Sequence, residues 1–313
     1  MENPKKILIV GTGGIGGYYG SKLARAGHHV SFVCRSDFQV VSEKGLEVKS
    51  YQGDYHVFAD QVVATPQDYV GQADLVLIAT KVLPEINLPE LIRPVVSPTS
   101  SILLIQNGIE IEEPIYKAFP NNPLYSAIAH IGVSKTQPGV VHHQLRGDLE
   151  IGCYPTNANF SADPWTQMFV DAGVKAKVSV DIERSRWKKL IWNLPFSPIS
   201  VLTQSDTQEM MNNPQIRQLV LGVMAEVVAL GRARGHLLDD RLINQNMEAT
   251  DRMPPYKTSM LLDFINGRQL EFKAILEAPL KIGIELGVPT PCIAILSGLT
   301  ELLSAKNNLM TRP

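Results

Sequence analysis

The most constraining feature of the chain is a glycine-rich turn between a short apolar run and a helical segment. Residues 6–10 read as a buried strand, and Gly11, Gly13 and Gly16 follow them at G-x-G-x-x-G spacing. After the helical segment, a second apolar run begins at His29. Strand, glycine turn, helix and strand in this order predict a βαβ unit of the Rossmann type.

Each of the three glycines has a physical role that a larger residue would not fill. Gly11 lets the chain leave the strand in a tight turn, Gly13 lets a pyrophosphate approach the backbone, and Gly16 lets the helix pack closely on the strand. Phosphates would then meet the N–H groups and the positive end of the helix. A turn whose glycines serve packing alone is the alternative. We predict a dinucleotide site at Gly11, Thr12, Gly13, Gly14, Ile15 and Gly16.

The end of the second strand indicates which dinucleotide binds. An NAD-type site usually has Asp or Glu there, about 20 residues after the glycines, to hold the ribose 2′-OH. This chain has Arg35 between Cys34 and Ser36, and its first carboxylate comes at Asp37. Arginine offers a planar, permanent cation to a 2′-phosphate, which a carboxylate would repel. The pattern favours NADPH as the cofactor, and an exposed loop arginine without that role is the alternative.

Composition is typical of a globular enzyme and argues against several other classes. The chain has 313 residues, of which 44% are hydrophobic, so two domains with cores of their own are expected. The net charge of −2, without a Lys/Arg stripe, argues against a nucleic-acid partner. No uncharged apolar run reaches about 18 residues, so no membrane partner is expected.

The cysteines and histidines indicate neither a disulfide framework nor a metal site. Cys34, Cys153 and Cys292 are odd in number and far apart. His130 and the pair at residues 142–143 have no Cys, Asp or Glu at ligand spacing. With the lack of a membrane-spanning run, these features favour a cytoplasmic protein.

The first half of the chain alternates strand-like and helical segments, as parallel α/β sheets do. Residues 74–80 and 101–106 are short apolar runs of the buried parallel type. Gly53 and Asp54 separate two strand-like segments and predict a hairpin. Glycines divide the following strands, which indicate an antiparallel extension of the sheet. The remaining predicted elements are hairpin strands at 46–50 and 55–58, extension strands at 124–133, 140–144 and 149–153, a helix at 165–172 and a strand at 174–178.

The second half of the chain changes to helical spacing from Asp181 onward. Asn213 and Pro214 begin a helix as its cap and its first residue, and this helix ends near Gly235. Further helices are predicted at residues 239–251, 256–266, 269–286 and 290–306.

The predicted fold is therefore α/β with two domains. Residues 1–180 form an N-terminal Rossmann-like doubly wound sheet, and residues 181–313 form a C-terminal all-α domain. A short hinge at residues 179–181 joins them, with a cleft between the domains.

A polar stripe on an apolar helix marks a candidate catalytic site. Helical spacing puts Lys189, Asn193 and Ser197 at i, i+4 and i+8 on one face, among apolar neighbours. Desolvation would lower the pKa of such a lysine, which suits proton transfer near neutral pH. A surface lysine that extends its head group from a buried helix is the alternative. Pro195 and Pro198 each remove a helical hydrogen bond and can kink this helix.

From end to end, the chain resembles the ketopantoate reductase (2-dehydropantoate 2-reductase) family. The order and spacing of several motifs carry the resemblance, including the distance from Glu271 to Gly287 and Pro291. The matching positions are the glycine turn, Arg35, Lys81, Asn107, Trp187-x-Lys189-Leu190-x-x-Asn193, Ser259-Met260-Leu261-x-Asp263 and Glu271.

The resemblance implies a role for each matching residue. Lys189 would be the catalytic acid, and Asn193 and Ser259 would bind substrate. Asn107 would lie beside both cofactor and substrate, and Glu271 would lie by the nicotinamide and the substrate. The residues implied in cofactor binding are those of the glycine turn, Arg35, Lys81, Asn107, Gly132 and Glu271.

Two positions depart from the family pattern. The family's reductases often carry a second substrate asparagine four residues after the first, where this chain has Ser197. A further asparagine, ten residues on, corresponds to Thr207. Both hydroxyls can still bind a substrate but reach less far, so the resemblance implies the reaction type more firmly than the substrate.

The implied function is NADPH-dependent reduction of a 2-oxo acid. The leading substrate is 2-dehydropantoate, which is reduced to pantoate in pantothenate biosynthesis. One alternative is a sister reductase of another 2-oxo or 3-oxo acid. Another is a non-catalytic NADP(H)-binding sensor, against which the retained Lys189 and Glu271 argue. The expected partner is a small oxo acid, and apolar helix faces leave a homodimer open.

Overall fold

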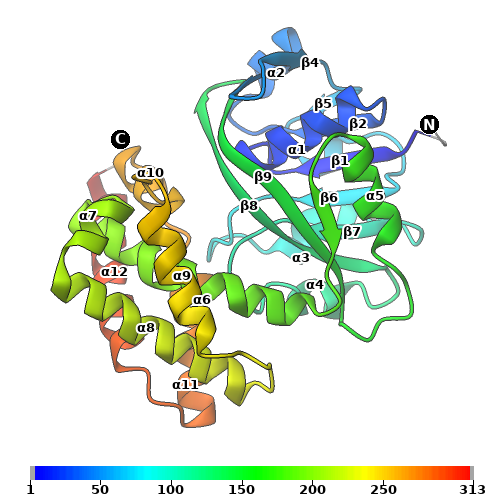
Figure 1. The fold of residues 1–313 in the computed structure, drawn as a ribbon. Helices are drawn as coiled ribbons and strands as arrows, with labels where there is room; N and C mark the ends of the chain where they lie inside the picture. The colour runs from blue at the N-terminus through cyan, green and yellow to red at the C-terminus, as the bar shows by residue number, and fades with distance from the viewer. Residues whose placement is uncertain (1–3, 311–313) are drawn as a thin grey trace. The chain divides into compact units, whose positions relative to one another are not determined.

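The computed structural model describes residues 4–310, so the outermost residues of the two predicted domains, 1–3 and 311–313, lie outside it. Within the described part, the chain divides into two compact units (Figure 1). The first contains a sheet with its helices and extends to Ile182, and the second is helical and takes up the chain from Glu183. Two short segments of the first half, Val82–Pro84 and Asn107–Glu110, belong to the second unit.

Among the described residues, the first unit is built on one ten-stranded sheet with accompanying helices. In chain order its strands are β1 (Lys6–Val10), β2 (His29–Val33), β3 (Leu46–Ser50), β4 (Tyr55–Val57), β5 (Gln61–Val63), β6 (Leu75–Ile78), β7 (Ser101–Leu104), β8 (Leu124–Gln137), β9 (Val140–Tyr154) and β10 (Ala176–Val178). Its α-helices are α1 (Gly14–Arg25), α2 (Phe38–Lys44), α3 (Leu88–Ile92), α4 (Glu113–Ala118) and α5 (Asp163–Asp171).

The strand order combines a Rossmann-like sheet with an antiparallel extension. The strands β7, β6, β1, β2 and β5 are neighbours in this order, and all of them run parallel. The strand β8 pairs parallel with β7 and antiparallel with β9, and beyond β9 lie β3 and its hairpin partner β4. The predicted Rossmann-like fold, the hairpin and the antiparallel extension are therefore confirmed.

Both faces of the parallel sheet are buried, because each strand alternates its side chains between two apolar layers. Ile7 and Ile9 of β1 belong to the core that also contains Tyr19 of α1 and Phe169 of α5. Leu8 points to the opposite face and is also fully buried. Strands with apolar residues on both faces need cover on both sides, as in a doubly wound sheet.

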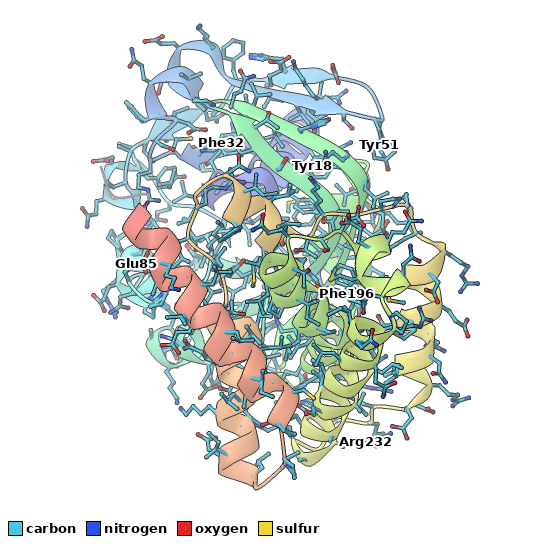
Figure 2. All side chains as sticks on the ribbon, turned by 90° about the vertical axis from the view of Figure 1, so that its left-hand side faces the viewer. Tyr18, Phe32, Tyr51, Glu85, Phe196 and Arg232 are labelled. Atoms are coloured by element: carbon cyan, nitrogen blue, oxygen red, sulfur yellow. The ribbon has the colours of Figure 1, made fainter. Side chains whose placement is uncertain are left out.

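The second unit is all-α and packs around one apolar core. Its α-helices are α6 (Ile182–Thr203), α7 (Thr207–Asn212), α8 (Pro214–Ala233), α9 (Arg241–Arg252), α10 (Ser259–Ile265), α11 (Ala278–Leu286) and α12 (Pro291–Met310). Phe196 of α6 is fully buried in this core (Figure 2), together with Leu194 and with Met224 of α8. As predicted, Asn213 caps α8, and its side chain accepts hydrogen bonds from two backbone amides of the first turn.

No helix within residues 4–310 combines the length and apolarity that crossing a bilayer requires.

The strand β9 is continuous, whereas the sequence predicts two strands, 140–144 and 149–153, separated at Gly147. Arg146 and Gly147 adopt φ values of 58° and 130°, and the pairing with β8 shifts register nearby. The glycine therefore forms part of a bulge within the strand instead of a turn that ends it. The prediction of two strands is wrong because a glycine with positive φ can form either a bulge within a strand or a turn that ends it, and the sequence does not distinguish the two.

The predicted helix at 269–286 is wrong at its N-terminal end. Residues 269–272 are not helical, a π-helical turn spans Lys273–Glu277, and α11 begins only at Ala278. Pro279 has no backbone N–H to donate to the preceding turn, so the hydrogen-bonding pattern changes where α11 starts. Glu271 consequently lies on a non-helical approach to this turn.

The close packing of α1 on the strand before it depends on two glycines. A Cβ on Gly16 would lie 2.2 Å from the carbonyl oxygen of Gly11 and 3.0 Å from Cγ2 of Ile9. Gly11 has a φ of +101°, and a Cβ there would lie 2.6 Å from the backbone nitrogen of Thr80. A Cβ on Gly13, by contrast, would meet no atom within 4 Å. Packing therefore requires glycine at positions 11 and 16 but not at 13.

Gly16→Ala should lower the free energy of unfolding by about 2–3 kcal/mol, because the backbone atom that its methyl group meets cannot give way without moving the turn. Gly13→Ala should stay within about 1 kcal/mol of the parent, since its methyl group enters open space. Urea unfolding of the parent and both variants measures the difference. Equal destabilisation by the two substitutions would contradict this reading of the turn.

Candidate functional site

The start of α1 offers a surface for phosphate groups. Gly13 is the N-cap residue, it has no side chain to cap the helix, and the first turn contains no acidic residue. The first N–H groups of a helix have no partner within the helix and carry the positive end of its dipole. Because the space beside Gly13 is open as well, these residues fit the pyrophosphate of a dinucleotide.

Arg35 places a positive charge just after the end of β2, and a hydrogen bond from Thr12 of the glycine turn holds this strand end. The hydroxyl of Thr12 donates a hydrogen bond of 2.9 Å to the carbonyl oxygen of Val33, two residues before Arg35. Arg35 is exposed, and its guanidinium has no hydrogen-bond or ion-pair partner within residues 4–310. The carboxylate of Asp37, in contrast, is buried and hydrogen-bonded. Arg35 is therefore available to an anionic ligand.

The strand β8 brings another predicted cofactor residue close to the glycine turn. Gly132 is buried in β8, two residues before Ser134. The backbone of Ser134 packs on the turn, because a Cβ on Gly14 would lie 3.1 Å from its Cα. The end of β8 therefore passes along the start of α1.

A side-chain hydrogen bond holds the ends of β6 and β7 together. The Nε2 of Gln106 donates to the carbonyl oxygen of Thr80 at 2.7 Å and to its hydroxyl at 3.1 Å. Lys81 follows Thr80 directly and is half-buried, and Asn107 follows Gln106. In the first unit, Lys81 thus directly follows a residue that this hydrogen bond fixes.

In the second unit, Lys189 lies in a hydrogen-bonded arrangement on α6. Its Nζ donates a hydrogen bond of 2.8 Å to Oδ1 of Asn107. The carbonyl oxygen of the next residue, Gly108, accepts a hydrogen bond of 3.1 Å from Nη1 of Arg186. Arg186 precedes Lys189 by three residues, so both project from the same face of α6. Two side chains, about one turn apart, therefore hold the segment Asn107–Glu110.

The π-helical turn holds the same segment through its backbone. Ile109 donates a backbone hydrogen bond of 3.1 Å to the carbonyl oxygen of Ala274. Gly108 has a φ of +95°, and a Cβ there would lie 2.3 Å from Cβ of Ala274. Only glycine combines this conformation with this approach, so the sequence Asn107-Gly108 is fixed by packing as well as by Arg186.

The environment of Lys189 makes it an unusually acidic lysine. Burial and the positive charge of Arg186 lower its pKa from 10.5 to about 8, although the carboxylate of Glu271 acts in the opposite direction. Oε1 of Glu271 accepts a hydrogen bond of 2.9 Å from the backbone nitrogen of Val82, which fixes the carboxylate. An ammonium with this pKa is protonated at neutral pH and can still give up its proton, as a general acid must.

Two further polar residues of α6 continue the face that carries Lys189. The helix runs through Pro195 and Pro198 as one element. Asn193 is half-buried and Ser197 is buried. Neither side chain has a hydrogen-bond partner in the part of the chain that the structure describes, which leaves both available to a ligand.

The start of α10 is tied to the same helix. Thr258 caps α10 by accepting a hydrogen bond of 3.2 Å from the backbone nitrogen of Leu261. Its hydroxyl also pairs with Oγ of Ser200 at 2.6 Å, and Ser200 lies on α6 three residues after Ser197. Ser259, the predicted substrate residue, is exposed and directly follows this cap. Its backbone position is thereby fixed relative to α6.

Thr207 has a structural role in the second unit. Its backbone N–H donates to the carbonyl oxygen of Tyr256, and its hydroxyl accepts from the backbone nitrogen of Tyr256, both at 3.0 Å. The residue is almost fully buried. This pair of hydrogen bonds fastens the connection between α9 and α10 to the start of α7.

Three residues of this arrangement were missed by reasoning from the sequence. Arg186 lies three residues before Lys189 on the same helix face, and Ser200 lies three residues after Ser197. Helical spacing alone could therefore have identified both. Thr258 carries the signal of a helix cap, a threonine directly before an apolar helix. The glycine turn, Arg35, Lys81 and Gly132 belong to the first unit, whereas Asn107 and Glu271 belong with Lys189 to the second.

Comparisons with known proteins agree over nearly the whole chain. The family model described as ketopantoate reductase PanE/ApbA matches residues 7–156, and the model for the C-terminal part of the same family matches residues 181–304. A 2-dehydropantoate 2-reductase from Nostoc sp. is 34% identical over 97% of this chain and 97% of its own length.

Solved structures show the same fold. The crystal structure of 2-dehydropantoate 2-reductase from Methylococcus capsulatus is 36% identical, covers 96% of this chain and 97% of its own, and has a TM-score of 0.89. A ternary structure of D-mandelate dehydrogenase with NADH and anilino(oxo)acetate covers 97% of this chain and 99% of its own, with a TM-score of 0.90. At 22% identity, this second likeness is one of fold alone.

The pKa of Lys189 should fall below about 8 when the charge of Glu271 is removed. Glu271→Gln keeps a side-chain oxygen for the backbone nitrogen of Val82 but removes the negative charge that favours the ammonium form. Competitive labelling of amines across pH, read by mass spectrometry in a Lys188→Arg background, measures the pKa of Lys189 alone. A value near 10.5 in the parent, or a rise in the variant, would contradict the electrostatic account.

Proposed function

Because the chain belongs to the ketopantoate reductase family, we propose that it reduces a 2-oxo acid with NADPH and that the substrate is 2-dehydropantoate, which becomes pantoate. Members of this family are oxidoreductases that act on CH–OH groups with a nicotinamide cofactor. The observation that carries the proposal is Lys189, a part-buried acid with a pKa of about 8 and a fixed hydrogen-bond partner.

The proposed chemistry divides between cofactor and protein. Reduction of a 2-oxo acid needs a hydride at the keto carbon, which NADPH supplies when bound, and a proton at the keto oxygen. The ammonium of Lys189 stabilises the negative charge that develops on this oxygen and then donates the proton to it. Lys189 is left as a neutral amine, which its lowered pKa makes accessible, and it takes a new proton from water.

The partners of Lys189 orient it for this step. Asn107 accepts a hydrogen bond of 2.8 Å from Nζ, which fixes the direction of the ammonium. Glu271 keeps a negative charge near the ammonium and so favours its protonated form before the reaction. Asn193, Ser197 and Ser259 are proposed to bind the hydroxyl and carboxylate groups of the substrate.

Two features support NADPH as the cofactor. The glycine turn and the start of α1 fit a pyrophosphate, and the guanidinium of Arg35, which has no partner among the described residues, fits a 2′-phosphate. The proposed cofactor ligands are the residues of the turn with Arg35, Lys81, Asn107, Gly132 and Glu271.

A sister reductase of another oxo acid is the second candidate, and Ser197 favours it. This residue stands where the family often has an asparagine, and it is buried with no hydrogen-bond partner among the described residues. A shorter side chain leaves more room at this place, which fits a different acyl group as well as 2-dehydropantoate. A non-catalytic sensor is disfavoured, since it would need neither the acidic lysine nor Glu271.

Lys189→Ala should lower kcat for oxo-acid reduction by ~10²–10⁴ and leave the Kd for NADPH nearly unchanged, because its work falls in the transition state. Lys188→Ala is the matched control and should stay within about threefold of the parent. Steady-state kinetics at saturating NADPH, with cofactor binding measured separately, tests both. In the parent, kcat/KM should fall as pH rises through about 8, since only the ammonium donates a proton.

A dead Lys188→Ala variant, or full activity in both, would refute the assignment of the proton donor. So would a pH profile that stays flat across the range in which Lys189 loses its proton.

Oxidation of NADPH across a panel of 2-oxo and 3-oxo acids tests the substrate. We expect turnover of 2-dehydropantoate, and Ser197→Asn should lower its KM because the longer amide restores the family's reach. Turnover of a different oxo acid, without turnover of 2-dehydropantoate, would establish the sister reductase instead. Tight NADPH binding without turnover of any member of the panel would point to the sensor.

A further inference from the structure

We propose that Lys135 is a second ligand for the 2′-phosphate of the cofactor, acting with Arg35, and that the buried Asp37 positions it. The proposal rests on the proposed use of NADPH and names a residue that selects this cofactor. Its basis is a group of contacts at the end of β2, all within the first unit.

The end of β8 carries Lys135 from the glycine turn to the loop after β2. The preceding residue, Ser134, packs its backbone on Gly14 of the turn. Four residues further along, the backbone nitrogen of Gly139 donates a hydrogen bond of 3.2 Å to Oδ2 of Asp37. Figure 1 shows this far end of the β8–β9 pair beside α2, the helix that follows the loop. Lys135 is thus held between the glycine turn, which is proposed to bind the pyrophosphate, and the loop after β2, which is proposed to bind the 2′-phosphate.

The ammonium of Lys135 reaches the residues that flank Arg35. Its Nζ lies 2.7 Å from Oδ1 of Asp37 and 3.4 Å from Oγ of Ser36. About a third of the side chain is exposed, at 32%, and both Ser36 and Arg35 are exposed. An ammonium has three donors, and the structure uses two of them here. Within residues 4–310 the third donor has no partner, so it is available to an oxygen of a bound phosphate.

The carboxylate of Asp37 is compatible with a phosphate bound nearby because it is buried and engaged by other groups. Its side chain is 4% exposed, and its two oxygens are engaged by Lys135, by the hydroxyl of Ser36 and by the backbone of Gly139. Burial alone would raise the pKa of Asp37, but these hydrogen bonds and the charge of Lys135 lower it below its ordinary value. A carboxylate that is buried and has both oxygens engaged is poorly placed to accept from the ribose hydroxyls that an NAD-type site binds.

The charges that remain at the surface favour the phosphorylated ribose. Arg35 and Lys135 carry two positive charges, and Asp37 carries one negative charge that points into the protein. A 2′-phosphate would be bound by both cations, whereas the hydroxyl of NADH would leave the guanidinium of Arg35 without a counter-charge among residues 4–310. An ion pair that only neutralises Asp37 is the alternative role for Lys135.

Binding of NADPH and NADH to the full chain, measured by titration calorimetry, separates these roles. Lys135→Met leaves Asp37 as an unpaired carboxylate, so the decisive variant is Lys135→Met with Asp37→Asn. If Lys135 binds the phosphate, this double variant should bind NADPH about tenfold or more weakly and NADH within about threefold of the parent. Lys135→Arg should retain the preference for NADPH, and Arg35→Ala should reduce it.

The matched control is Lys177→Met, which breaks another lysine–carboxylate pair of the same sheet, 3.0 Å from Glu150, and should change neither affinity. Amine labelling of the unmodified protein is the second measurement. Adenosine 2′,5′-bisphosphate should protect Lys135 from labelling, and AMP should not. This readout holds even where a variant fails to fold.

Each of the other outcomes overturns the proposal in a distinguishable way. Parent-like NADPH binding by the double variant would mean that Lys135 only neutralises Asp37. Equal weakening of both cofactors would mean a structural role. Parent protein that binds NADH as tightly as NADPH would overturn the proposed cofactor itself. If the parent prefers NADPH and only Arg35→Ala removes the preference, the cofactor stands and the role of Lys135 falls.

Discussion

An ammonium that has lost most of its water must be held by other polar groups, and this requirement organises the second unit. Lys189 donates to Asn107, while Arg186, about one turn earlier on α6, holds the backbone of the same segment. Burial lowers the pKa of Lys189 most, the charge of Arg186 lowers it further and the charge of Glu271 raises it, which together place it at about 8. Each partner comes from a different part of the chain. The acid therefore exists only when α6, the segment after β7 and the approach to the π-helical turn are packed together.

Patterns with a local period were readable from the sequence, and contacts between distant segments were not. The strands β1, β6 and β7 are uninterrupted apolar runs, and the stripe from Lys189 to Ser197 is a helical repeat, so both follow from spacing alone. Short elements such as α2, α3, α4, α7 and β5 carry too few residues to show a period. The hydrogen bond from Lys189 to Asn107 joins residues 82 positions apart, and only the family resemblance pointed to Asn107. The π-helical turn depends on Pro279 and on its packing against Gly108, which no single segment reveals.

The end of β2 shows how burial changes the meaning of a charge. In the sequence, Arg35 and Asp37 are two residues apart and carry opposite charges, so a sum of the charges in this loop would make the pair neutral. In the structure Arg35 is exposed and unpaired among the described residues, while Asp37 is buried under hydrogen bonds. The positive charge therefore faces solvent and the negative charge faces the protein. Residue types alone do not reveal this difference, because the lysine that engages the Asp37 carboxylate comes from β8, 98 positions along the chain.

The residues around Lys189 differ in how freely they can change. Asn107, Gly108 and Glu271 are committed to hydrogen bonds or to close backbone packing, so substituting them disturbs the fold as well as the acid. Asn193 and Ser197 lie on the same helix but have no hydrogen-bond partners within the described residues. A change at either position therefore removes no side-chain hydrogen bond between described residues. Under the proposed function, reaction type and substrate choice would be carried by different residues of one helix face, so that the proton donor could be kept while the acid that is reduced changes.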